Sequence, residues 1–235
     1  MSSNRRAFLQ RATLGAVSLG VLPSALSAAP MTVAPMTAAP SRVPDLSLAD
    51  PEWDVSWTKK ITGKHKAMFD VPGVAGGSGV LRAGLWAKQY SDVFKMPQSE
   101  LSSVIVLRHE GIILAMNQAF WDEYDVGKHN KVRDGNDKKT NKNPALSVVQ
   151  EGKEPTPFDN YMLEQQIARG VVVLACNMAF GGCVRMVMKH DKLKQPEARE
   201  KAKGMLIQGI ILQPSGIFAD VLAQESGCAF VAASN

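Results

Sequence analysis

The chain contains little cysteine, and its few cysteines lack the spacing of a metal site or a redox pair. There are three in 235 residues, Cys176, Cys183 and Cys228. None forms a CxxC motif, and the four histidines are scattered without an HExxH motif, so we expect no structural zinc. Three cysteines cannot all be paired within one chain, so at least one thiol is free, modified or paired with another chain. We predict neither a metal ion nor a cofactor.

The chain also lacks an excess of charge once its amino-terminal segment is set aside. Three of the 27 basic residues lie in that segment, which has no acidic residue, so 24 basic residues face 22 acidic ones and the net charge is +2. This balance does not favour a nucleic-acid partner. The run from Lys128 to Lys142 is locally basic but rich in Asn, Asp and Gly. We interpret residues 128–153 as a solvated polar and basic loop insertion.

No hydrophobic run of membrane length follows the amino-terminal segment. That segment carries a twin-arginine pattern, NRRAFLQ at Asn4–Gln10, followed by the apolar, uncharged run Ala12–Ala29. Small residues near its end suit cleavage, which predicts a Tat signal peptide over 1–29; an uncleaved anchor is the alternative. Residues 30–50 form a Pro/Ala-rich linker, and 51–235 the folded domain. We expect a periplasmic protein with no membrane span after cleavage.

Five short apolar runs alternate with amphipathic segments in the predicted domain. The expected strands are 66–71, 104–107, 171–174, 209–212 and 228–232, and the expected helices are 80–94, 156–169, 182–190, 195–206 and 217–225, with a short one near 120–124. This alternation predicts a three-layer α/β/α sandwich with a mainly parallel five-stranded sheet. Trp53 and Trp57 are expected to attach the linker to this domain.

The candidate site follows from the ends of these strands. The carboxyl ends of parallel strands meet at one edge of a sheet, where ligands collect. Asp70, His109, Cys176 and Ser215 each lie at or just after such an end. A helix amino terminus or a nearby imidazolium would favour a Cys176 thiolate there. The alternatives are structural: Cys176 as a small buried side chain, His109 as a loop residue and Ser215 as a helix N-cap.

Three further residues have two interpretations each. Asn177 would hold the turn that we expect after Cys176, or donate a hydrogen bond to a sulfur or an anion. Cys183 is a candidate resolving thiol, with a core position as the alternative. Cys228 begins an apolar strand, and we expect it to be buried and inert.

These motifs resemble a known family. A strand ending in ACN (175–177), a later one ending in QPSG (213–216) and the closing QESGCAFV (224–231) are similar to the DsrE/DsrF-like sulfur-relay fold. The resemblance covers about residues 66–234. It implies a three-layer α/β/α domain, assembly into trimers or hexamers, and a persulfide-carrying cysteine at the position of Cys176. Ser215 and Gly216 match the fold motif. The export leader and the 128–153 insertion are departures from the family pattern.

The resulting hypothesis is a periplasmic DsrE-like protein that carries sulfur as a persulfide, or has a thiol-redox role, through Cys176. Asn177, His109, Ser215, Gly216 and Asp70 would line its binding site. Its expected partners are further copies of itself and a sulfur donor or acceptor, either a protein or a small sulfur compound. No complete catalytic motif is present, so whether it is a sulfur transferase stays open. The alternative is a non-catalytic module that binds a small ligand or a partner.

Overall fold

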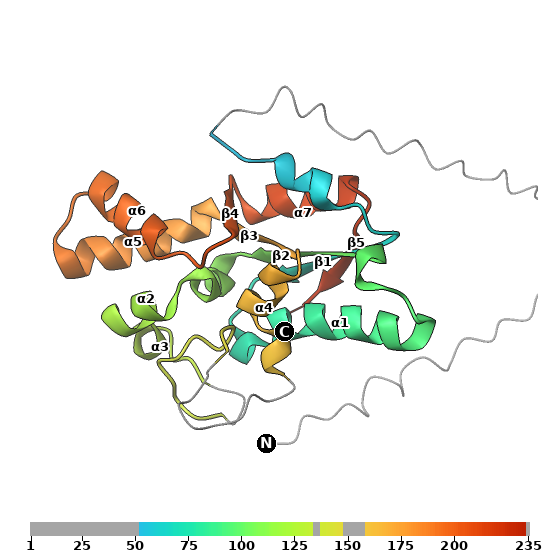
Figure 1. Cartoon of the computed structure of the whole chain (residues 1–235). Coiled ribbons are helices and arrows are strands. Elements are labelled where there is room, and N and C mark those ends of the chain that lie inside the picture. The colour runs from blue at the N-terminus through green and yellow to red at the C-terminus, as the bar shows by residue number, and fades with distance from the viewer. Residues whose placement is uncertain (1–51, 134–136, 148–157, 234–235) are drawn as a thin grey trace, which may run out of the picture. The chain divides into compact units, whose positions relative to one another are not determined.

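Five parallel strands form a single sheet in the computed structural model, which describes residues 52–133, 137–147 and 158–233 (Figure 1). The strand order is β4-β3-β2-β1-β5, and every neighbouring pair is parallel. The predicted fold class is confirmed. The strands are β1 His65–Val71, β2 Leu101–Leu107, β3 Val172–Cys176, β4 Ile210–Gln213 and β5 Ala229–Ala232.

Helices flank the sheet on both faces (Figure 1). The α-helices are α1 Ser78–Phe94, α2 Gln118–Glu123, α3 Val126–His129, α4 Leu163–Ala168, α5 Asn177–Asp191, α6 Gln195–Gly204 and α7 Gly216–Glu225. Short 3-10 segments span Ser56–Lys60, Ala75–Gly77, Gln98–Glu100, His109–Ala115 and Asp159–Tyr161.

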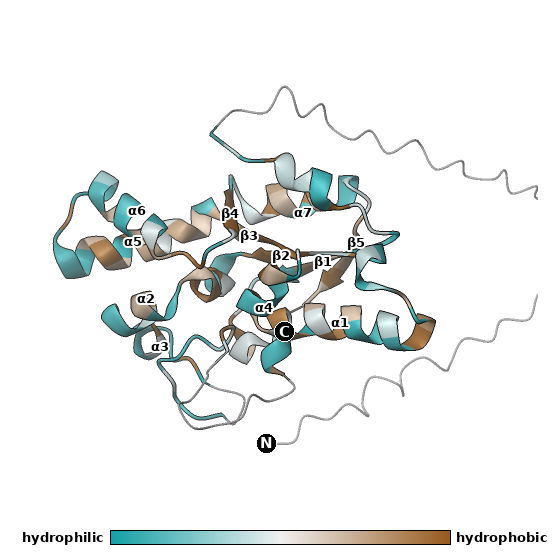
Figure 2. Ribbon diagram, viewed as in Figure 1, coloured by the Kyte–Doolittle hydropathy of each residue, from teal (hydrophilic) through white to brown (hydrophobic). Residues whose placement is uncertain are grey.

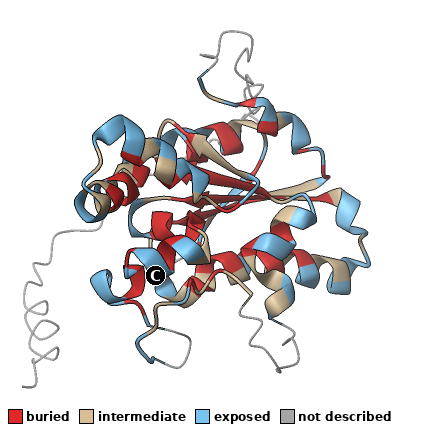
Figure 3. Ribbon diagram, turned by 60° about the vertical axis from the view of Figure 1, so that its left-hand side comes forward, coloured by how far each residue is buried: buried red, intermediate tan, exposed pale blue. Residues whose placement is uncertain are grey.

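The central strands are apolar on both faces, as a covered parallel sheet requires. Alternate residues of each strand enter opposite layers. Met68, Val106 and Leu174 pack in the layer that contains α7, whereas Phe69 and Ile105 pack in the layer that contains α1 and α5. The apolar colour of the central strands β2 and β3 in Figure 2 coincides with their burial in Figure 3. The hydrophobic core is therefore split into two layers by the sheet.

The segment before β1 is attached to the domain by an aromatic side chain. Trp57, in the 3-10 segment Ser56–Lys60, is fully buried and belongs to the apolar layer of α7. Trp53 is only partly buried. Trp57 thus anchors the segment before β1 to the core; the linker itself lies outside the described residues, so its attachment stays a prediction.

Two helix boundaries differ from the prediction. Helix α5 begins at Asn177, directly after β3, and not at Gly182, because the Cys176 side chain caps it and no turn intervenes. The helix predicted over 156–169 begins, in its described part, at Leu163. Met162 has an extended backbone, with ψ of 162°, and separates α4 from the preceding 3-10 segment. Residues 156 and 157 lie outside the described residues.

The predicted loop insertion is packed in part. Asn143 is fully buried, and its amide donates hydrogen bonds to the carbonyls of Leu114 and Met116. Val132 and Ala145 are buried as well. The interpretation of this stretch as a wholly solvated loop is therefore wrong for these residues. The predicted leader and linker lie outside the described residues, and none of the described helices has the length and apolar character that a membrane span needs.

Candidate functional site

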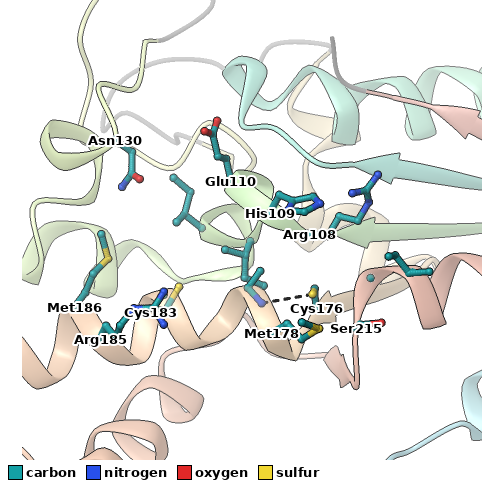
Figure 4. A pocket seen from close by; sticks show the side chains of 16 residues that line it. Arg108, His109, Glu110, Asn130, Cys176, Met178, Cys183, Arg185, Met186 and Ser215 are labelled. Carbon is teal, nitrogen blue, oxygen red and sulfur yellow. Dashed lines mark hydrogen bonds between the residues drawn. The ribbon is translucent and has the colours of Figure 1, made fainter.

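A cavity of about 480 Å³ lies at the carboxyl edge of the sheet (Figure 4). It is bounded by the first turns of α5, the 3-10 segment His109–Ala115 and the start of α7. Its polar and sulfur-containing lining residues are Arg108, His109, Glu110, Asn130, Cys176, Met178, Cys183, Arg185, Met186 and Ser215. Three of the predicted site residues, His109, Cys176 and Ser215, thus meet at one cavity, and Gly216 lines it too.

Cys176 is both the last residue of β3 and the N-cap of α5. Its Sγ accepts a hydrogen bond from the Ala179 amide at 3.5 Å, and the residue is 7% exposed. The first amides of a helix lack intrahelical partners and carry the positive end of its dipole. The Cys176 sulfur therefore lies at the positive end of the α5 dipole, and the residue lines the cavity.

His109 turns the chain out of β2. Its φ of +47° is uncommon for a residue other than glycine, and it begins the 3-10 segment that forms one wall of the cavity. Two residues later, a Cβ on Gly111 would lie 2.2 Å from the Val71 carbonyl oxygen. Only glycine therefore allows this segment to close against the end of β1. The His109 side chain is exposed and lines the cavity.

Asp70 lies at the same edge but is engaged by Arg108. The guanidinium donates from Nε and Nη2 to the two Asp70 carboxylate oxygens, both at 2.6 Å. This bidentate pair raises the pKa of Arg108. The second carboxylate beside Arg108 is Asp220 of α7, whose Oδ2 lies 3.6 Å from Nε. Burial and the charge of Asp70 raise the pKa of Asp220 to about 7, although Arg108 opposes the shift.

Ser215 and Gly216 start α7 and support Arg108. The Ser215 hydroxyl oxygen accepts a hydrogen bond from the Phe218 amide at 3.0 Å, so it is the N-cap that the sequence suggested. A Cβ on Gly216 would lie 2.5 Å from Cδ of Arg108. Because Gly216 has no side chain, the Arg108 side chain can pass close to the start of α7 and reach the Asp70 carboxylate.

Asn177 has a different environment from the one predicted. Its side-chain oxygen accepts a hydrogen bond from Nη2 of Arg199 at 2.6 Å, and Arg199 also lies over the ring of Phe180. The residue is not among those that line the cavity. It joins α5 to α6 and is not part of a turn after Cys176, because no such turn exists.

The other two cysteines are buried, as expected. Burial raises the pKa of Cys183 to about 12 and that of Cys228 to about 11. Cys183 also lines the cavity, seven residues along α5 from Cys176. A helix rises 1.5 Å per residue, so the two Cα atoms are separated by roughly 10 Å, beyond the ~7 Å that a disulfide tolerates. Cys183 is thus unsuited to resolve Cys176 while α5 is intact.

Three residues of this region were not singled out from the sequence. Arg108 directly follows the predicted strand 104–107, Asp220 lies within the predicted helix 217–225, and Arg185 lies within the predicted helix 182–190. Arg185 is exposed beside the cavity and has no hydrogen-bonding or carboxylate partner within the described part of the chain. Side chains alternate along a strand, so residue 108 continues the face of Val106. This alternation was the one sequence signal that could have placed Arg108.

A group of side chains with metal-binding types lies elsewhere. Glu123, His190 and Asp191 have ligand atoms within 4.8 Å of one another. However, Lys201 donates from Nζ to Glu123 at 2.6 Å and to Asp191 at 2.7 Å. The hydrogen bonds to Asp191 and Glu123 raise the pKa of Lys201, and the Lys201 ammonium in turn lowers the pKa of Asp191 to about 2. The chain therefore supplies its own cation to these carboxylates.

The fold and the site define an α/β protein that presents a helix-capping thiol in a basic cavity at the carboxyl edge of a parallel sheet. Comparisons with protein-family models, with curated proteins and with solved structures found no match.

Proposed function

We propose that the protein is a DsrE-like carrier of sulfane sulfur, exported to the periplasm, in which Cys176 is the nucleophile and the attachment point. The observation that carries the proposal is the position of the Cys176 sulfur at the amino terminus of the 15-residue helix α5, in a cavity that Arg185 also lines. Positive charge near a thiol favours the thiolate, which is the reactive form.

The cavity suits a small anionic donor. Of the residues that line it, Glu110 is the only acid; Arg108 is paired with Asp70, and Arg185 is the other arginine of the lining. Its volume of about 480 Å³ admits a compound the size of thiosulfate or a short polysulfide. The sulfur atoms of Met178, Cys183 and Met186 make the remainder of the lining soft and polarisable. Arg185 is available to contact an anion because it has no carboxylate partner among the described residues.

The proposed transfer needs only one thiolate. The Cys176 sulfur attacks the sulfane sulfur of the donor, a new S–S bond forms, and the S–S bond of the donor breaks. With thiosulfate, the leaving group is sulfite, which takes the bonding electron pair, and Cys176 becomes a persulfide anion. The total charge of the reacting groups is −3 both before and after the transfer. An acceptor thiolate later attacks the outer sulfur and releases Cys176 as the leaving group.

The alternative is a module that binds a ligand without reacting. The small exposed fraction of Cys176, 7%, favours it, since a packed thiol at a helix terminus is a sufficient N-cap. In that case the cavity binds an anion or a partner surface, and removal of the Cys176 sulfur leaves binding intact.

Assembly into a trimer or hexamer, which the family resemblance implies, belongs to the same proposal. The side chains of Ile217, Phe218 and Val221 on α7 are 69%, 40% and 48% exposed, and Met178 at the cavity is 75% exposed. An apolar surface of this kind beside the cavity is suited to a protein contact, with another copy or with a sulfur donor or acceptor.

The test is sulfur loading of single-cysteine variants. The mature protein is incubated with thiosulfate or polysulfide, and sulfane sulfur is released with cyanide and quantified. Cys176→Ala is expected to lose at least nine-tenths of the signal. Cys228→Ala is the matched control, because it removes a buried thiol that does not line the cavity and should retain loading. Unchanged loading in Cys176→Ala would rule out the carrier role, and retained binding of thiosulfate in that variant would support the binding module.

A further inference from the structure

A buried ionic group of three residues, Asp70, Arg108 and Asp220, lies between α7 and the carboxyl ends of β1 and β2; we refer to it as the acid–arginine cluster. Asp70 and Arg108 already form a complete bidentate pair. Asp220 adds a second carboxylate that is 8% exposed. Its Oδ1 is buried with no hydrogen-bond partner among the described residues, and its Oδ2 is 3.6 Å from Arg108, too far for a good hydrogen bond.

A purely structural role explains Asp220 poorly. A buried carboxylate with an unsatisfied oxygen costs folding free energy, and an asparagine or leucine would fill the same space without a charge. The neighbouring pair does not need it, because Asp70 alone neutralises Arg108. Buried acids that destabilise a fold and lie beside a candidate site are often part of the chemistry of that site.

Arg108 connects the cluster to Cys176. Its side chain lines the cavity that contains the thiol, and the two residues interact through their charges. Gly216 leaves the space through which the arginine passes. Arg108 therefore links the charge of the cluster to Cys176.

Two groups dominate the electrostatic environment of Asp220. The charges of Asp70, on β1, and Arg108, after β2, act on it in opposite directions. Lys66, at the other end of β1, donates instead to the Ser226 carbonyl. The remaining titratable or charged groups of the elements packed against α7 are His65 on β1, Cys176 at the end of β3, Cys228 before β5, Glu225 at the end of α7, and Asp54, Lys59 and Lys60 around the 3-10 segment of Trp57.

We propose that Asp220 is a positioning residue that sets, through Arg108, the net charge next to Cys176, so that protonation of Asp220 controls the reactivity of the thiol. The inference rests on the proposed function, in which Cys176 is the reactive group. With Asp220 protonated, one carboxylate balances one guanidinium. With Asp220 ionised, the cluster carries a net charge of −1, which disfavours the Cys176 thiolate and repels an anionic donor.

The consequence is a pH dependence that no single thiol would show. The pKa of about 7 for Asp220 places its ionisation in the physiological range. As the pH rises, loss of the Asp220 proton opposes loss of the Cys176 proton, so the rate of Cys176 alkylation rises less steeply than for one independent group. Without the Asp220 charge, the rate of Cys176 alkylation should follow the titration of a single group.

The experiment measures iodoacetamide alkylation of Cys176 in the mature protein between about pH 5.5 and about 9.5, resolved by peptide mass. Asp220→Asn is expected to follow a single-group curve and to react about threefold to tenfold faster than the wild type at about pH 8, with little difference below about pH 6. Glu225→Gln is the matched control, since it removes a carboxylate from the same helix away from the cluster, and it should follow the wild-type curve.

Asp220→Leu is the second variant, should the asparagine prevent folding, and the same curve is expected from it. If Cys176 alkylates in the folded wild type but both variants superimpose on it, this inference is wrong and the proposed function stands. If Cys176 resists alkylation at every pH until the protein is unfolded, the proposed function and the inference both fail.

Discussion

At the scale of single residues, the position of Arg108 depends on the lack of a side chain at Gly216. Gly216 has no Cβ, and one placed there would come within 2.7 Å of both Cδ and Cβ of Arg108. The arginine can then reach Asp70 while its side chain lines the cavity. Gly216 therefore matters because it leaves space for Arg108, and not because it has an unusual backbone angle.

Substituting Gly216→Ala should displace Arg108 and leave Asp70 buried with a weakened partner. The expected loss of stability is about 1–3 kcal/mol, measured as the free energy of unfolding in urea. Gly204→Ala is the matched control, because nothing lies within 4 Å of a Cβ at the end of α6. Equal stability of the two variants would contradict the placement of Arg108 against α7.

The raised pKa of Asp220 also predicts how stability changes with pH. Below about pH 4 the carboxyl is protonated in both the folded and the unfolded chain, so it costs nothing. Between the ordinary value of 3.8 and about 7, only the unfolded chain ionises, and the folded state loses stability progressively. Above about pH 7 the full cost is present.

Asp220→Asn removes this linkage. Relative to the wild type, its free energy of unfolding should rise between about pH 4 and about pH 8 by roughly 2–4 kcal/mol, and then level off. Urea titrations at several pH values measure this difference, and any constant cost of the amide cancels from it. A difference that does not vary with pH would mean that Asp220 ionises in the folded protein as it does in the unfolded chain.

At the scale of elements, the strands were readily predicted and the start of α5 was not. Apolar runs locate all five strands, and those of β2 and β3 are rich in β-branched residues because these strands are covered on both faces. The helix was predicted to begin at Gly182, after a turn, yet Gly181 and Gly182 both lie inside α5. The Cys176 sulfur caps the helix five residues earlier, and thiols are not among the residues from which an N-cap is normally expected.

Because α5 begins at Asn177, Gly181 lies inside the helix and not before it. The residue lies in the interior of α5 with a helical backbone, and a Cβ there would meet only Arg185, at an ordinary 3.6 Å. Gly181→Ala should therefore stabilise the protein by about 0.5–1 kcal/mol, as alanine does relative to glycine inside a helix. Thermal unfolding measures the effect. A destabilised variant would show that the glycine pair forms a turn after all.

Of the residues of the site, some were likewise predicted from the sequence and others were not. Asp70, His109, Cys176 and Ser215 were found because a strand end can be read from local sequence. Arg108, Asp220 and Arg185 were missed because their importance arises from packing between β1, β2 and the helices, which are distant in sequence. Asp220 in particular is one polar position within an amphipathic helix, and its burial depends on how α7 is rotated against the sheet.

At the scale of the whole molecule, the proposed assembly can be tested through α7. Val221→Lys places a charge in the exposed apolar surface formed with Ile217 and Phe218, and it should shift the protein towards monomers in light scattering after gel filtration. Phe94→Lys is the control, since Phe94 is 59% exposed at the end of α1, in the layer on the other face of the sheet. An unchanged mass for Val221→Lys would exclude this surface as the contact between copies.

The central claim is that Cys176 carries sulfur, and the intact mass of the protein isolated from its own cells tests it most directly. The mass is measured before and after reductant, with alkylation mapped to each cysteine. The account predicts a reductant-labile gain of roughly 32 Da, one sulfur atom, located on Cys176. An unmodified Cys176 that alkylates only after unfolding would contradict it and identify the thiol as a structural helix cap.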